Sequence, residues 1–129
     1  MARDNSSRTY RILAVDNEPN QVLILDAALR KLPNVEVFTA DSAEEALNLF
    51  QQHPFDLVIT DYRMRGMDGL TLAAGVRRLR PHAPIVLVTA YPDEVRERAR
   101  HMSLFAILEK PVSVKDIRTT ALKALGFHG

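Results

Sequence analysis

RILAVDNEPN, residues 11–20, changes within one step from a short apolar run to an acidic cluster. The run at residues 11–15 has the length and composition of a buried β-strand. The cluster at residues 16–18 follows it directly, and Pro19 is well placed at the first position of a helix. This stretch therefore predicts a strand that ends in oxygen-bearing side chains and is followed by a helix.

Similar apolar runs recur at regular spacing along the chain. They do not alternate with polar residues, which is typical of parallel strands that are covered on both faces. The predicted strands are residues 11–15, 35–38, 57–60, 85–88 and 105–108. The segments between them have the apolar spacing of amphipathic helices. The predicted helices are residues 19–32, 41–50, 69–80, 92–102 and 113–125.

Five strands that alternate with five helices predict an α/β fold with an open, doubly wound parallel sheet. The chain has 129 residues, which suits one domain around a single hydrophobic core. Residues 1–9 precede the first strand and are expected to form a flexible N-terminal tail, with the domain itself at residues 10–126. The mixed charges of residues 92–102 predict a solvated helix face.

The composition excludes several classes of protein. With 47% hydrophobic and 26% charged residues, the chain is typical of a globular protein, and no apolar run approaches membrane-spanning length. It has no cysteine and its N-terminus lacks the apolar core of a signal peptide, so we expect a cytoplasmic location. A formal net charge of +1 predicts no direct binding to nucleic acid or to an anionic membrane.

Chemistry is expected at the carboxyl ends of the strands, because ligands bind there in open α/β sheets. The candidates are Asp16 and Asn17 after the first strand, Asp61 after the third, Thr89 after the fourth and Lys110 after the fifth. Clustered carboxylates repel one another unless a cation lies between them, and Mg²⁺ prefers oxygen ligands. A hydroxyl and an ammonium group opposite them would hold a group with several negative oxygens, such as a phosphoryl. Each residue alone has a simpler explanation, such as a helix cap, but four suitable types at four strand ends favour a joint site.

The segments ILAVDNEP, DLVITDYRMRGMDGL, IVLVTA and ILEKP resemble the receiver domains of two-component response regulators. The resemblance covers residues 10–126 and implies a flavodoxin-like sheet with strand order 2-1-3-4-5. It also implies a phosphorylation-dependent signalling switch that takes its phosphoryl group from a sensor histidine kinase or a phosphotransferase protein. Such a domain is not a conventional enzyme, since at most it phosphorylates and dephosphorylates itself. The fourth helix, fifth strand and fifth helix would provide a surface for homodimers.

Position by position, the resemblance implies roles for the candidate residues. Asp61 would be the phosphoacceptor and would form an aspartyl phosphate, with Thr89 and Lys110 bound to the phosphoryl oxygens. The implied Mg²⁺ ligands are Asp16, Asn17, Asp61 and the backbone carbonyl of Arg63. The peptide bond between Lys110 and Pro111 is expected to be cis.

Two departures from the family's pattern bear on the predicted function. Asn17 stands where most members carry a second acid, so it keeps an oxygen ligand but removes a negative charge, which predicts weakened Mg²⁺ binding. Ile107 stands where many members carry an aromatic residue that moves on phosphorylation. These two positions support an alternative function, a pseudo-receiver that binds a protein partner independently of phosphorylation.

A third class of function is an enzyme or cofactor carrier on the same fold. An FMN site needs a phosphate loop rich in Ser, Thr and Gly after the first strand, and residues 16–18 would repel a phosphate instead. A phosphatase with an aspartyl intermediate would carry a second Asp two residues after its nucleophile on the first strand, where this chain has Glu18. The sequence therefore favours the signalling switch over both.

Overall fold

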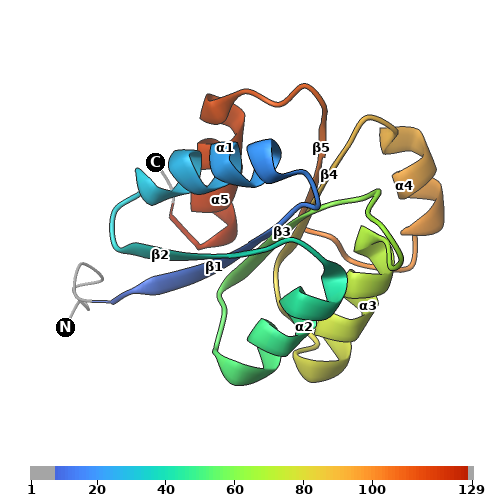
Figure 1. Cartoon of the computed structure of the whole chain (residues 1–129), viewed down its shortest axis with the longest axis horizontal. Helices are drawn as coiled ribbons and strands as arrows, with labels where there is room; N and C mark the ends of the chain where they lie inside the picture. The colour runs from blue at the N-terminus through green and yellow to red at the C-terminus, as the bar shows by residue number, and fades with distance from the viewer. Residues whose placement is uncertain (1–7, 128–129) are drawn as a thin grey trace.

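The computed structural model describes residues 8–127, which form five strands and five helices in strict alternation. The strands are β1 (Tyr10–Val15), β2 (Val35–Ala40), β3 (Leu57–Asp61), β4 (Ile85–Thr89) and β5 (Ala106–Glu109). The helices are α1 (Pro19–Arg30), α2 (Ala43–Gln52), α3 (Gly69–Leu79), α4 (Pro92–Arg98) and α5 (Val114–Ala124). All strand pairs are parallel and the order is β2-β1-β3-β4-β5, which confirms the predicted flavodoxin-like sheet (Figure 1).

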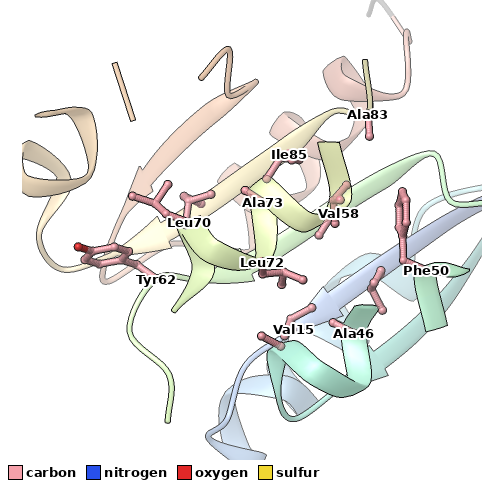
Figure 2. Close-up of a cluster of buried hydrophobic side chains, with 14 of the residues drawn as sticks. Val15, Ala46, Phe50, Val58, Tyr62, Leu70, Leu72, Ala73, Ala83 and Ile85 are labelled. Carbon is pink, nitrogen blue, oxygen red and sulfur yellow. The ribbon is translucent and has the colours of Figure 1, made fainter. Parts of the chain in front are cut away.

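Helices cover both faces of the sheet, with α1 and α5 on one side and α2, α3 and α4 on the other (Figure 1). Successive side chains of a strand point to opposite faces, so each strand contributes to two cores. In β1, Ile12 belongs to the core beneath α1 and α5, whereas Leu13 and Val15 belong to the core beneath the other three helices. Figure 2 shows this second core, with Phe50 from α2, Leu72 from α3 and Val58 from β3 among its members.

The predicted elements are all present, and the differences lie at their ends. The fourth helix ends at Arg98 instead of residue 102, because Ala99 leaves helical geometry and the Met102 N–H bonds to the Ala99 carbonyl in a turn. Val95, Ala99 and Met102 nevertheless pack against the same core, so their spacing resembles that of a longer helix.

Part of the predicted N-terminal tail, residues 1–7, lies outside the described residues. Arg8, which follows it, forms an ion pair with Asp56 at 2.6 Å. Within the described part of the chain, no helix combines the length and the apolar character needed to cross a bilayer.

The start of α3 is packed directly against the end of β3. The N–H of Gly69 donates to the carbonyl oxygen of Tyr62 at 2.7 Å. A Cβ atom on Gly69 would overlap the backbone carbonyl oxygen of Asp61 and would lie 3.1 Å from the Cα atom of Tyr62. The missing side chain therefore lets the helix begin beside the last residue of β3.

Replacing Gly69 with alanine should consequently destabilise the protein. We expect Gly69→Ala to lower the free energy of unfolding by about 1–3 kcal/mol, because backbone atoms must move to admit the methyl group. Gly75→Ala, in the same helix, is the control: its Cβ would meet only the flexible end of Leu47, at 2.9 Å. A gain of about 1 kcal/mol in helix propensity offsets that contact. Urea unfolding measures both, and equal losses would contradict the role given to Gly69.

Candidate functional site

The carboxyl edge of the sheet brings together side chains from four strands. Asp16 follows β1, Asp61 is the last residue of β3, Thr89 is the last residue of β4 and Lys110 follows β5. Among residues 8–127, the buried polar or charged side chains are Asp16, Thr60, Asp61 and Thr89. Three of these four, Asp16, Asp61 and Thr89, were predicted as site residues. Each sits at a strand end, and these ends lie at the same edge of the sheet because the strands are parallel.

Lys110 and Asp61 form the central contact of this edge. The Lys110 ammonium nitrogen lies 2.7 Å from Oδ1 of Asp61, whose side chain is 9% exposed. The backbone N–H of Lys110 donates to the carbonyl oxygen of Thr89 at 2.8 Å, which fixes the start of the loop after β5. The Lys110–Pro111 peptide bond is cis, as expected. The ammonium group of Lys110 is thus held against the carboxylate of Asp61.

Asp16 provides a second carboxylate with incomplete charge compensation. Its Oδ1 atom accepts a hydrogen bond from the backbone N–H of Glu18 at 2.9 Å. Burial raises the pKa of Asp16 and the negative charge of Asp61 raises it further, although the Glu18 N–H and the ammonium of Lys110 act in the opposite direction. The balance is unfavourable to the charged form, so an added cation would stabilise this site.

A cavity of about 530 Å³ opens beside the two carboxylates. Asp16, Asp61 and Lys110 line it, together with the polar residues Glu18 and Gln21. Its other walls are apolar and come from α1, β4 and α5, with Leu25, Val88 and Ile117 among the lining residues. The cavity is in the size range of small-ligand pockets and combines charged with apolar lining residues.

The remaining predicted residues lie around this centre. The Thr89 side chain is buried, and its Oγ1 atom accepts a hydrogen bond from the backbone N–H of Tyr91 at 2.9 Å. Asn17 is half-buried next to Asp16. The Arg63 side chain is exposed and turns toward α4, where it donates to Glu94 at 3.1 Å and lies 4.3 Å from the Tyr91 ring centre. Metal binding by Asn17 and by the Arg63 carbonyl stays a prediction.

The carboxylates of Asp16 and Asp61 at this edge of the sheet fit Mg²⁺ better than a metal that needs many protein ligands. In the described ranges of the chain, no three acidic, cysteine or histidine side chains gather in a metal-binding arrangement. A cation here would therefore be bound by the carboxylates of Asp16 and Asp61, and its other ligands would be neutral oxygens. Mg²⁺ is commonly bound in this way, through one or two carboxylates together with phosphate oxygens and water.

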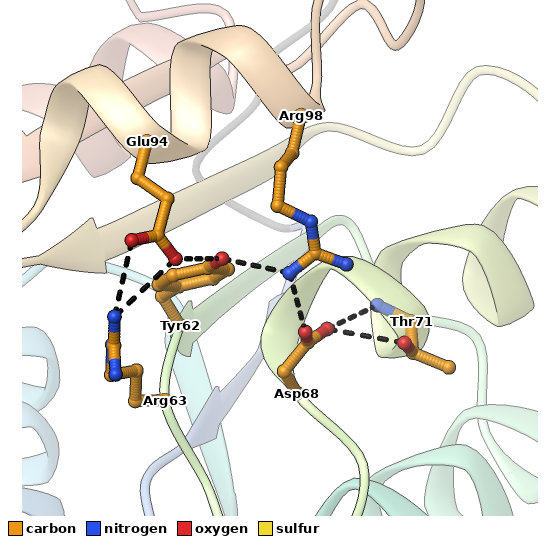
Figure 3. A network of polar contacts seen from close by, with 6 residues as sticks. All are labelled: Tyr62, Arg63, Asp68, Thr71, Glu94 and Arg98. Atoms are coloured by element: carbon orange, nitrogen blue, oxygen red, sulfur yellow. Dashed lines mark hydrogen bonds and ion pairs between the residues drawn. The ribbon is translucent and has the colours of Figure 1, made fainter.

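The sequence analysis missed a group of polar contacts behind the site. Tyr62, the residue after Asp61, bonds through its hydroxyl to Glu94 and Arg98 of α4, and Arg98 also bonds to Asp68 (Figure 3). The charges of this helix were predicted to form a solvated face, and Glu94 and Arg98 are indeed exposed, but their bonds to Tyr62 were not foreseen. Their spacing of four residues places both on one side of a helix, but this pattern does not identify Tyr62 as their partner.

The chain is similar to several known proteins in sequence and in fold. A sequence profile described as the response regulator receiver domain matches residues 12–122. The sensor histidine kinase GacS of Pseudomonas protegens is 34% identical over 127 residues, and the transcriptional regulatory protein GlrR of Escherichia coli is 34% identical over 110 residues. These matches cover 94% and 83% of this chain, but only 14% and 24% of the two relatives.

A solved structure shares the whole fold. The response regulator protein TrrA from Thermotoga maritima, solved in complex with Mg²⁺ and BeF, is 33% identical. The match covers 91% of this chain and 100% of that one, with a TM-score of 0.81.

Proposed function

Because the chain belongs to the response regulator receiver domain family, we propose that it is a phosphorylation-dependent signalling switch with Asp61 as its phosphoacceptor. The observation that best supports this proposal is the Asp61 carboxylate at the end of β3, 2.7 Å from the Lys110 ammonium and open to a cavity. The match to GacS, which is named a sensor histidine kinase, supports a donor of that kind or a related phosphotransferase protein.

The proposed reaction transfers a phosphoryl group from a donor histidine to the Asp61 carboxylate. A carboxylate oxygen forms a bond to phosphorus while the bond between phosphorus and the histidine nitrogen breaks, and the electron pair leaves with the imidazole. Lys110 would then exchange its contact with Asp61 for one with a phosphoryl oxygen, and the Thr89 hydroxyl would donate to another. The transfer needs no further reactant.

Mg²⁺ is part of this proposal, and Asp16, Asn17, Asp61 and the Arg63 carbonyl would hold it. When bound, the ion would offset the charge of the two carboxylates and of the incoming phosphoryl oxygens. The presence of Mg²⁺ in the TrrA complex supports this assignment for a similar protein. Without such an ion, the buried charge of Asp16 would repel the donor.

We place the protein in the cytoplasm and propose that it does not bind nucleic acid or a membrane directly. Homodimers would form through α4, β5 and α5, the surface that the resemblance implies. A pseudo-receiver, which would bind its partner without phosphorylation, is the alternative that Asn17 and Ile107 favour. Phosphorylation of Asp61 separates the two functions.

Acetyl phosphate and Mg²⁺ should therefore add one phosphoryl group to the wild-type protein, as read by intact mass spectrometry. We expect Asp61→Ala to lose this mass increase and Asp93→Ala, which removes a fully exposed carboxylate on α4, to keep it. Chelation of Mg²⁺ should also abolish the increase. A modified Asp61→Ala variant would assign the phosphoryl group to another residue. An unmodified wild type that also fails to bind beryllofluoride would favour the pseudo-receiver.

Restoring the acid at position 17 should tighten Mg²⁺ binding. A unit charge about 4 Å from another is worth about 4 kcal/mol at an effective dielectric of about 20, and desolvation offsets most of it. We therefore expect Asn17→Asp to bind Mg²⁺ about tenfold more tightly than wild type in isothermal titration calorimetry. Asn48→Asp adds the same charge to the exposed face of α2 and serves as the control. Equal affinities for wild type and Asn17→Asp would remove position 17 from the metal site.

A further inference from the structure

Tyr62 occupies a position between the phosphoacceptor and α4. It directly follows Asp61, its backbone N–H donates to Val88 at 3.0 Å, and its carbonyl accepts from Gly69 at 2.7 Å. Its side chain is 2% exposed and belongs to the core between the sheet and α2, α3 and α4, where Figure 2 labels it. A shift of the Asp61 backbone would therefore carry this ring with it.

The hydroxyl of Tyr62 is the centre of a polar network (Figure 3). It donates to Oε2 of Glu94 at 2.6 Å and accepts from the guanidinium of Arg98 at 2.7 Å. Arg98 also binds Oδ2 of Asp68 at 2.7 Å, and Arg63 donates to Oε1 of Glu94 at 3.1 Å. We call Tyr62, Arg63, Asp68, Glu94 and Arg98 the α4 clamp, because these contacts join α4 to both ends of the loop between β3 and α3.

The charges of the α4 clamp support one another. The hydrogen bond from Tyr62 and the charge of Arg63 lower the pKa of Glu94. Partial burial works against the charged form of Asp68, but the bond from Arg98 and the Thr71 N–H outweigh it and lower the pKa of that carboxyl. Burial and the Glu94 carboxylate raise the pKa of Tyr62, so its hydroxyl stays protonated and able to donate.

The buried hydroxyl of Tyr62 is the strongest part of the α4 clamp. Glu94, Arg98 and Arg63 are substantially exposed, and exposed ion pairs contribute little to stability on their own. A buried hydroxyl that both donates to and accepts from charged groups contributes more, and its removal leaves two charged partners without their shared contact.

Apolar packing against the sheet also holds α4 in place. The helix has seven residues, of which Val95 is buried, and Ala99 is buried at its end. A helix of two turns is not stable by itself, so its position depends on its tertiary contacts. The α4 clamp adds polar contacts that join α4 to the loop after Asp61.

We propose that Tyr62 is a positioning residue that couples the phosphoryl state of Asp61 to the position of α4 through the α4 clamp. This inference rests on the proposed function, because it needs a phosphoryl group at Asp61. Movement of Lys110 and Thr89 toward that group would shift the end of β3 and change the distances from the Tyr62 hydroxyl to Glu94 and Arg98. Coupling of this kind is reciprocal, so a partner bound to α4 would in turn change the affinity of Asp61 for a phosphoryl group.

Tyr62→Phe tests the proposal, since it removes only the hydroxyl and keeps the buried ring. The first measurement is amide hydrogen exchange of α4 without ligand. We expect exchange to rise about fivefold, the effect of losing one hydrogen bond, while the other helices stay unchanged. The control is Tyr10→Phe, which removes the hydroxyl of a buried tyrosine at the opposite end of the sheet. Unchanged exchange of α4 in Tyr62→Phe would overturn the α4 clamp.

The second measurement adds Mg²⁺ and beryllofluoride, a phosphoryl mimic, to both proteins. We expect the mimic to change α4 exchange in wild type and in Tyr10→Phe, and to change it much less in Tyr62→Phe. An equal response in all three proteins would overturn the coupling and leave the proposed function intact. A wild type that fails to bind the mimic would overturn the proposed function and the coupling together, whereas the first measurement would still test the α4 clamp.

Discussion

Two buried carboxylates, those of Asp16 and Asp61, share the end of the sheet with a single ammonium group, that of Lys110. Burying an ionised carboxylate is costly unless it is paired, and one ammonium cannot pair with both. The contact between Lys110 and Asp61 is therefore only a partial solution, since burial and, to a lesser extent, the charge of Asp61 still raise the pKa of Asp16. In the proposed function, a divalent cation would offset this imbalance and would allow a phosphoryl group to bind.

The fold tolerates this charge imbalance because helices pack on both faces of the sheet and stabilise its carboxyl edge. Parallel pairing of β1, β3, β4 and β5 fixes the spacing of the strand ends, and apolar cores on both faces keep the strands in register. Gly69 lets α3 start against the carbonyl of Asp61. Lys110, which is followed by a cis bond to Pro111, directs its ammonium group toward Asp61 from the loop after β5. In the proposed coupling, a displacement at Asp61 would reach α4 through Tyr62, whose hydroxyl bonds to Glu94 and Arg98.

Most of the fold could be predicted because its signals are local. Apolar runs and helical spacing predicted all ten elements, and the largest error in their bounds arose where a turn carries the same spacing as a helix, as at Met102. The sequence could also predict that Asp16, Asp61 and Lys110 lie together, because parallel strands end at one edge of the sheet. The contact of Tyr62 with Glu94 could not be predicted, since it joins residues 32 positions apart and depends on how α4 is oriented, which no local pattern encodes.

A crystal structure grown with Mg²⁺ and beryllofluoride would test the central claim most directly, because it would show where the charges of this edge are balanced. The account predicts one Mg²⁺ bound by Asp16 and Asp61, with the beryllofluoride on Asp61 and in contact with Thr89 and Lys110. A structure in which Lys110 keeps its contact with Asp61, with neither the ion nor the mimic at this edge, would contradict it.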